Sequence, residues 1–292
     1  MKSAQTDLAR HGTGSPTRPH PIVYTDGDRR WLMFSDGAIQ SEMLLSDPDG
    51  LTLPYTRAIM CFVLFQPAPR EILIVGLGGG SLVKFCLRHL PGARITVLEI
   101  DEQVIALRAS FAIPPDNERL RVVHADAAQY IATLEAQVDV LIIDGFDAHG
   151  QPPQLASADF YAACRRAMRP AGVVVVNLHS SEPDYAGIAQ RLRIAFDDRT
   201  CRFKGIALHN HILFAVAAAN GFTRAHLLQR LLARTQGFGG ELNRLLARAV
   251  VWRLRRHARV ASPAANIHDM PGSGTTSACN RNEPQDASDL QP

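Results

Sequence analysis

Between residues 71 and 217 the chain alternates short apolar runs with stretches of helical periodicity. The apolar runs are rich in β-branched residues and lie at 72–76, 94–100, 120–125, 138–144, 172–178 and 211–217. Helical stretches separate the first five runs, at 81–90, 102–111, 127–134 and 158–168. Unbroken apolar strands that alternate with helices are typical of a parallel sheet covered on both faces. Right-handed crossovers then predict an α/β fold with a doubly wound, mostly parallel sheet.

The flanking segments divide the rest of the chain. Residues 1–20 and 261–292 are rich in small and polar residues, so we expect both to be disordered. Residues 21–54 hold three strand-like runs separated by the turns TDGD and SDG, which predict a small antiparallel β meander. The segment 55–66 is apolar on most faces, as expected of a buried helix, and opens a Rossmann-like domain over 55–220.

A basic segment follows at 221–260. Nine arginines occur between Arg224 and Arg259, with Glu241 as the one acid, whereas the rest of the chain is mildly acidic. Leucines recur at helical spacing on both sides of GFGG, so we expect two helices packed on the domain with a solvated basic face. A second interpretation is that 224–259 contacts nucleic acid, an anionic lipid surface or an acidic partner.

Composition excludes several classes of protein. No apolar run reaches the roughly 18 residues of a membrane span, and the N-terminus lacks the apolar core of a secretory signal. The five cysteines are odd in number and form no CxxC pair, so neither a disulfide framework nor a metal site is predicted. We therefore expect a cytoplasmic protein that holds no metal.

Candidate chemistry begins at the carboxyl end of the first predicted strand, where parallel sheets bind ligands. The motif GLGGGS contains four glycines that would let the backbone approach a ligand closely: Gly76, Gly78, Gly79 and Gly80. The second strand ends at Glu99, where a carboxylate can accept both hydroxyls of a ribose. The plainer alternatives are a structural glycine turn and a solvated acid at a strand end.

The third and fourth strands also end in carboxylates. Asp126 is positioned to meet an adenine amino group, or to cap the helix that begins at Ala127, and the two roles are compatible. Asp144 emerges at the mouth of the site and Asp147 follows one turn later, so the two could hold or deprotonate an amine. The sequence DGFD also suits a plain loop. Together the four strand ends indicate a nucleoside site.

From about residue 31 to 217 the chain resembles the spermidine synthase superfamily, which comprises the polyamine aminopropyltransferases and their methyltransferase-like relatives. The motifs that carry the resemblance are GAIQ with Gln40, YTRA with Tyr55, GLGGGS, LEID with Glu99, HADA with Asp126 and Ala127, and DGFD with Asp144 and Asp147. The resemblance implies a seven-stranded sheet of the S-adenosylmethionine-dependent methyltransferase type. It also implies a small-molecule amine or other nucleophile as acceptor, and it allows a homodimer formed through the N-terminal strands.

The resemblance further implies roles for individual residues. The donor, S-adenosylmethionine or its decarboxylated form, would be bound by the four glycines together with Gln40, Glu99, Asp126 and Ala127. Catalysis would fall to Asp144, Asp147 and Tyr55. In polyamine synthesis Asp144 would deprotonate the amine of putrescine, whereas in methyl transfer it would align a nucleophile with the sulfonium methyl group.

Three departures from the family pattern bear on the choice between these reactions. An aspartate that helps hold the donor's amine in aminopropyltransferases is replaced by Gly79, and a glutamine and a glutamate are replaced by Thr56 and Arg57. Arg57 could pair with the carboxylate of intact S-adenosylmethionine or lie on the helix surface. These departures favour transfer of a methyl or related group to an amine or hydroxyl over spermidine synthesis. A non-catalytic nucleotide-binding protein is the third hypothesis.

Overall fold

The computed structural model describes residues 20–35, 37, 39–146, 150–203 and 209–217. The chain divides into two units, 1–253 and 254–292, and all of the described residues belong to the first. The predictions of disorder at 1–20, apart from residue 20 itself, and at 261–292, and of basic helices at 221–260, lie outside the described residues.

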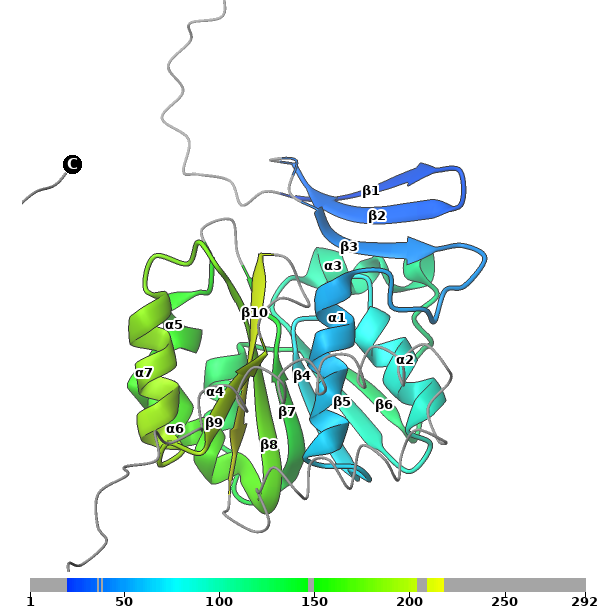
Figure 1. The fold of residues 1–292 in the computed structure, drawn as a ribbon. Coiled ribbons are helices and arrows are strands. Elements are labelled where there is room, and N and C mark those ends of the chain that lie inside the picture. The colour runs from blue at the N-terminus through cyan, green and yellow to red at the C-terminus, as the bar shows by residue number, and fades with distance from the viewer. Residues whose placement is uncertain (1–19, 36, 38, 147–149, 204–208, 218–292) are drawn as a thin grey trace, which may run out of the picture. The chain divides into compact units, whose positions relative to one another are not determined.

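A seven-stranded sheet forms the core, as predicted (Figure 1). Its strands, in spatial order, are β6 (Leu120–His124), β5 (Arg94–Glu99), β4 (Glu71–Val75), β7 (Val138–Ile143), β8 (Met168–His179), β10 (Asn210–Val216) and β9 (Thr200–Phe203). The strands from β6 to β8 pair in parallel, whereas β10 is antiparallel to both of its neighbours. The chain builds outward from β4 in one direction and then crosses to β7, so the topological switch point lies between β4 and β7.

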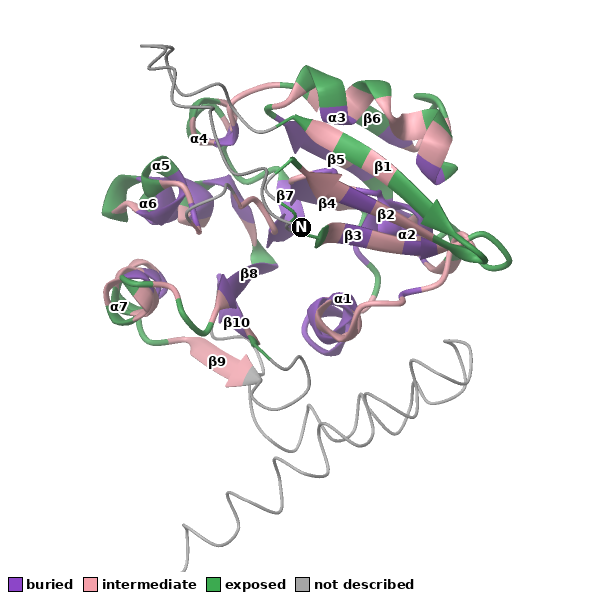
Figure 2. Cartoon of the chain, turned by 90° about the horizontal axis from the view of Figure 1, so that it is seen from above, coloured by how far each residue is buried: buried purple, intermediate pink, exposed green. Residues whose placement is uncertain are grey.

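Helices cover both faces of this sheet. Their bounds are α1 (Pro54–Ile59), α2 (Ser81–His89), α3 (Glu102–Ala106), α4 (Ala127–Ala132), α5 (Pro153–Ala156), α6 (Ala158–Ala167) and α7 (Tyr185–Ala195). Seen from above, α4, α6 and α7 lie on one face of the sheet and α1 on the other (Figure 2). The apolar side chains of α4, α6 and α7 pack with those of β4, β7 and β8 into one large core.

Several elements differ from the prediction. The single helix expected over 55–66 is α1 followed by a 3-10 turn, η1 (Met60–Leu64), whose five side chains are all buried, so packing sets the backbone there. The helix expected over 102–111 also splits, into α3 and η2 (Arg108–Phe111), which ends at Ala112 with a left-handed φ of 53°. The sequence does not predict α7, because Ile188 and Leu192 are its only fully buried side chains.

The predicted N-terminal meander is confirmed as a separate three-stranded antiparallel sheet of β1 (Pro21–Asp26), β2 (Arg29–Phe34) and β3 (Ile39–Leu44). It contacts the main domain near α2 and η2. Arg30 donates a hydrogen bond to the carbonyl oxygen of Ser110, and Ser41 of β3 lies beside the glycine turn. The meander therefore reaches the carboxyl end of β4, where the candidate site is expected.

A buried lysine lies in this contact. Lys84 of α2 is only 2% exposed, and its Nζ donates to the carbonyl oxygen of Phe111 at 2.7 Å and lies 3.1 Å from Met43 Sδ. Burial lowers the pKa of Lys84 to about 8, against an opposing effect of Asp49. Between about pH 8 and the ordinary lysine pKa near 10.4, the folded state therefore binds fewer protons than the unfolded state. The cost of burying the charged Lys84 falls over this window, so the free energy of unfolding rises with pH.

We expect Lys84→Met to raise the free energy of unfolding at neutral pH by about 1–3 kcal/mol, because it removes a buried charge that has no carboxylate in contact with it. The gain should shrink toward about pH 10, where Lys84 is already neutral in the folded wild type. Urea denaturation at both pH values measures this effect. Arg88→Met, at an exposed position of the same helix, is the control. A less stable Lys84→Met variant at neutral pH would contradict the expectation.

Candidate active site

The candidate site lies where the parallel strands end. Backbone hydrogen bonds tie the strand ends together: Gly76 N donates to Leu98 O at 2.8 Å, and Asp144 N donates to Val75 O at 3.0 Å. Gly76 has a φ of +93°, and a Cβ atom placed on it would lie 2.5 Å from the carbonyl oxygen of Asp144. A side chain at position 76 would therefore collide with the backbone of the predicted catalytic aspartate.

The glycine turn has an open half and a buried half. Gly76 and Gly78 are half-buried, whereas Gly79 and Gly80 are buried. A Cβ atom on Gly79 would lie 2.7 Å from Ser41 Oγ, and one on Gly80 would lie 2.5 Å from the side chain of Ile113. A side chain at 79 or 80 would therefore displace Ser41 or Ile113, and the left-handed φ of +66° at Gly80 also favours glycine. That all four glycines line a ligand remains a prediction.

Glu99 ends β5 and holds the glycine turn in place. Its side chain is only 9% exposed, so the alternative of a solvated acid is wrong. One carboxylate oxygen accepts a hydrogen bond from Leu77 N at 2.8 Å and the other accepts one from Asp101 N at 2.9 Å. Burial raises the pKa of Glu99, and these backbone amides oppose the rise. Each oxygen keeps a further lone pair, so the carboxylate can still accept hydroxyl groups.

The neighbouring strand end carries the next two predicted residues. Asp126 is the N-cap of α4, and its carboxylate accepts hydrogen bonds from Ala128 N at 2.8 Å and Gln129 N at 3.4 Å. The capping role is therefore confirmed, and contact with an adenine stays a prediction. Ala127 is buried at the start of α4, and Gln40 is half-buried on β3, next to the serine that faces Gly79.

Asp144 is brought together with Tyr55, as the prediction of a shared catalytic role requires. The Tyr55 hydroxyl hydrogen-bonds with the Asp144 carboxylate, which also accepts a hydrogen bond from Asn177 Nδ2 at 2.8 Å. Burial raises the pKa of Asp144 to about 7, although both hydrogen bonds oppose the rise. Burial and the nearby Asp144 charge raise the pKa of Tyr55 well above its ordinary value, so Tyr55 remains a donor. Such a carboxylate can exchange a proton near neutral pH.

Two residues that the sequence reasoning missed complete this network. Asn177 lies on β8, is only 2% exposed, and accepts a hydrogen bond at its Oδ1 from Asn210 Nδ2 of β10 at 3.0 Å. The available signal was an amide directly after four valines in the run VVVVNL. A buried amide in an apolar strand needs partners for its polar atoms, which a neighbouring strand must supply.

The predicted roles of Asp147 and Arg57 are not confirmed. Asp147 lies outside the described residues. Arg57 donates hydrogen bonds to the carbonyl oxygens of Leu51, at 2.6 Å, and Thr52, at 3.3 Å. It thereby fixes the loop that leads into α1, a role that neither of its two predicted alternatives included.

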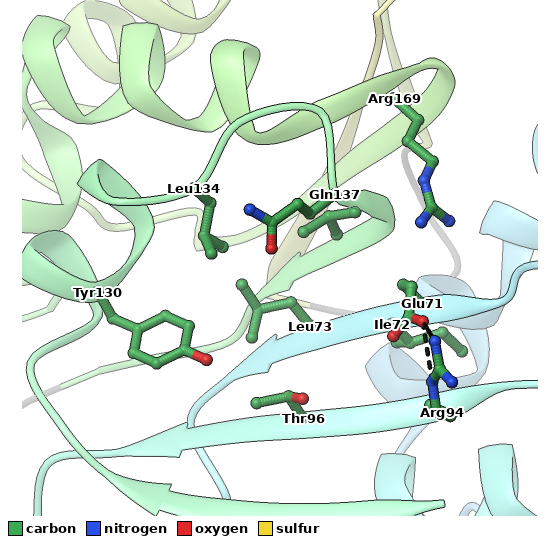
Figure 3. A pocket seen from close by; sticks show the side chains of 10 residues that line it. Glu71, Ile72, Leu73, Arg94, Thr96, Tyr130, Leu134, Gln137 and Arg169 are labelled. Atoms are coloured by element: carbon green, nitrogen blue, oxygen red, sulfur yellow. Dashed lines mark hydrogen bonds and ion pairs between the residues drawn. The ribbon is translucent and has the colours of Figure 1, made fainter.

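A cavity of about 330 Å³ lies at the opposite end of the strands from the candidate site, near the amino ends of β4 and β5 (Figure 3). Its lining combines apolar side chains such as Leu73 and Leu134 with polar ones such as Tyr130 and Gln137. Arg94 and Glu71 form an ion pair at its rim. The cavity contains none of the predicted site residues and is separate from the carboxyl-end site.

The described part of the chain shows neither a cluster of metal ligands nor a membrane-spanning helix. Among those residues, His, Cys, Asp and Glu form no group of three or more that could hold a metal ion. The helices described in the structure include none that is long and apolar enough to cross a membrane.

Solved structures share the fold. A spermidine synthase in complex with the transition state analogue AdoDATO superposes with a TM-score of 0.59 at 20% identity, covering 82% of this chain and 89% of that one. Human methyltransferase-like protein 13 in complex with SAH superposes with a TM-score of 0.55 at 23% identity, covering 66% and 92%. At these identities the likeness concerns the fold alone.

Sequence comparison is more specific. Residues 52–186 match the spermine/spermidine synthase domain. A polyamine aminopropyltransferase from Chromobacterium violaceum is 34% identical over 233 residues, which cover 78% of this chain and 89% of the relative. The matched region contains Tyr55, the glycine turn, Glu99 and Asp144, whose geometry is described above. The chain therefore belongs to the spermine/spermidine synthase family and is a transferase.

Proposed function

We propose that this chain is a polyamine aminopropyltransferase, which transfers the aminopropyl group of decarboxylated S-adenosylmethionine to an amine such as putrescine. The observation that carries the proposal is the half-buried Asp144 carboxylate held by Tyr55 and Asn177 at the switch point of the sheet. The preference for methyl transfer drawn from Gly79, Thr56 and Arg57 is not supported by the relatives, which are named polyamine aminopropyltransferase.

The proposed reaction is a displacement at carbon. A polyamine nitrogen is mostly protonated at neutral pH and becomes a nucleophile only after it loses a proton. Asp144 would hold this ammonium group and accept the proton, which a carboxylate with a pKa of about 7 can do. The free amine then attacks the methylene carbon next to the sulfonium. The carbon–sulfur bond breaks, its electron pair neutralises the sulfur, and methylthioadenosine leaves.

The protein would contribute mainly position, because the sulfonium donor is already activated. Glu99 would hold the ribose hydroxyls, since it is fixed by two backbone amides and has acceptor capacity left. Tyr55 would keep the Asp144 carboxylate aimed at the amine. Asp147 remains a predicted second carboxylate for the same amine.

Position 79 sets this chain apart within the proposed function. Ser41 Oγ and Phe111 lie within 3.0 Å of the place that a Cβ atom at 79 would take, so an acid there would require these two side chains to move. We therefore expect the donor's ammonium group to be held by weaker hydrogen-bonding groups than a carboxylate. Discrimination between the decarboxylated and intact donors should be correspondingly modest.

The decisive experiment offers the purified protein each donor with a panel of diamines and analyses the products by mass spectrometry. We expect methylthioadenosine and an aminopropylated amine from the decarboxylated donor. S-adenosylhomocysteine formed from the intact donor would instead support methyl transfer. Binding of both donors without turnover of either would support the non-catalytic hypothesis.

A further inference from the structure

We propose that Asn177 and Asn210 are positioning residues that set the direction of the hydrogen bond to Asp144, so that Asp144 faces the acceptor amine as a hydrogen-bond-accepting carboxylate. This inference rests on the proposed function, in which Asp144 takes a proton from the amine. Neither asparagine was predicted from the sequence, and both come from strands on the far side of β7 from the glycine turn.

The geometry forms one chain of hydrogen bonds with a direction. Asn210 Nδ2 donates to Asn177 Oδ1 at 3.0 Å, and Asn177 Nδ2 donates to Asp144 Oδ1 at 2.8 Å. If the Asn177 amide alone turned over, its oxygen would face the carboxylate and its amino group would face the amino group of Asn210. Both contacts would then join groups of the same kind, and the two polar atoms of Asn177, which is only 2% exposed, would lose their partners. In its observed orientation, Asn210 therefore holds the donating end of Asn177 toward Asp144.

The direction of the chain is coupled to the protonation of Asp144. In the observed direction Asp144 accepts, as a carboxylate does. In the reverse direction Asn177 Oδ1 would face Asp144, which would then have to donate and so carry the proton. A residue at position 210 that donates favours the charged form of Asp144, and one that can only accept favours the protonated form.

The other groups around Asp144 leave this coupling intact. Tyr55 of α1 is the titratable group that acts on the carboxylate from the described elements, and its raised pKa keeps it a donor. Gly76, directly after β4, lies against the Asp144 backbone, and β8 and β10 contribute the two neutral amides. Hydrogen bonds from Asn177 and Tyr55 both lower the pKa of Asp144, in the direction that the relay requires.

The test uses Asn210→Asp, which converts the donor at the head of the chain into an obligate acceptor of nearly the same shape. We expect the pKa of Asp144 to rise by about one unit or more, because the Asn177 amide turns toward the new carboxylate. The acidic limb of the pH profile of kcat/KM should move upward by the same amount. Asn177→Leu, which removes the donor without adding charge, should also move the limb upward.

Ser180→Asp is the matched control for added charge, since Ser180 lies exposed just beyond the end of β8 and does not touch the relay side chains. It should move the limb by less than about 0.3 unit, the size expected of a screened surface charge. Circular dichroism and donor binding establish that each variant is folded.

A second readout separates this inference from the proposed function. Carbon-13 NMR titration of labelled aspartates, with Asp144→Asn to assign the resonance, gives the pKa of Asp144 without any turnover. A raised pKa in Asn210→Asp but not in Ser180→Asp supports the relay even if no aminopropyl transfer is found. An unchanged pKa and pH profile in both Asn210→Asp and Asn177→Leu would overturn the relay, whether or not the wild type makes a polyamine.

Discussion

Replacing Asp144 by asparagine should lower kcat for aminopropyl transfer by a factor of about 10²–10⁴, the range expected for loss of a group that accepts a proton from the nucleophile. Asparagine keeps the shape of the side chain and can still accept a hydrogen bond from Asn177, whose Nδ2 lies 2.8 Å from Asp144. It cannot take a proton from an ammonium group. Donor affinity should change little, because the proposed donor contacts lie at the glycine turn and Glu99.

Steady-state kinetics with the decarboxylated donor, combined with calorimetric titration of donor binding, measures both parts of this expectation. Tyr55→Phe is the matched comparison, since it removes one hydrogen bond to the carboxylate and keeps the proton acceptor. It should reduce kcat less than Asp144→Asn does and move the acidic limb of the profile upward. An Asp144→Asn variant with kcat within about tenfold of the wild type would rule out general-base catalysis by this residue.

Asp144→Asn should also stabilise the fold. The pKa of Asp144 is raised to about 7 in the folded state, so the folded protein binds more protons than the unfolded chain between about pH 4 and 7. The stabilisation that Asp144 gives by being protonated is therefore complete below its pKa in the unfolded chain, about 4. It is lost as the pH rises through its pKa in the folded protein, about 7. Asp144→Asn should remove this loss and be more stable than the wild type at about pH 8, by on the order of 1–3 kcal/mol. Thermal melts at acidic and alkaline pH measure the difference.

Glu99→Ala should weaken donor binding by a factor of about 10²–10³, because two hydrogen bonds from ribose hydroxyls to a charged acceptor would be lost. It also leaves Leu77 N and Asp101 N without the carboxylate they contact, so the variant should unfold more easily by about 2–3 kcal/mol. Calorimetric titration with methylthioadenosine and with its 2′-deoxy analogue separates the two effects. The wild type should prefer the compound with both hydroxyls, and Glu99→Ala should not.

Asp101→Ala serves as the control for this second prediction. It removes a carboxylate two residues away that caps α3 by accepting a hydrogen bond from Gln103 N at 2.8 Å. Stability should fall by about 1 kcal/mol with the lost cap, while the preference for the 2′-hydroxyl should persist. A Glu99→Ala variant that still prefers the hydroxylated compound would show that the ribose is held elsewhere.

The sequence predicted the sheet and the glycine turn because both depend on local patterns. Runs of β-branched residues mark β4, β5, β6, β7, β8 and β10, and each lies close to the predicted range. The edge strand β9 is only TCRF, with Arg202 in the middle and partial exposure, so it has no apolar run to detect. Its place in the sheet depends on pairing with β10, which is information that a local pattern does not contain.

The site was predictable where a residue's position follows from the end of a strand. Asp126 and Asp144 lie where the strand ends predict, and Asp144 meets Tyr55 as the catalytic roles require. The partner Asn177 could not be found this way, because it is 33 residues from both Asp144 and Asn210 and meets them only through the order of β7, β8 and β10. The contact of Ser41 with Gly79 joins the N-terminal sheet to the turn after β4, and spacing along the sequence does not predict it either.

The order of the strands also constrains how the chain can fold as it is synthesised. Of the described strands, β10 is made last, yet it lies between β8 and β9 and carries Asn210 to its partner. A nascent chain that has released β9 but not β10 has no partner for β9 and no complete relay at Asp144. Pairing of β10 therefore completes the described sheet and brings Asn210 to Asn177, so a chain arrested before residue 210 would lack both the partner of β9 and the hydrogen bond to Asn177.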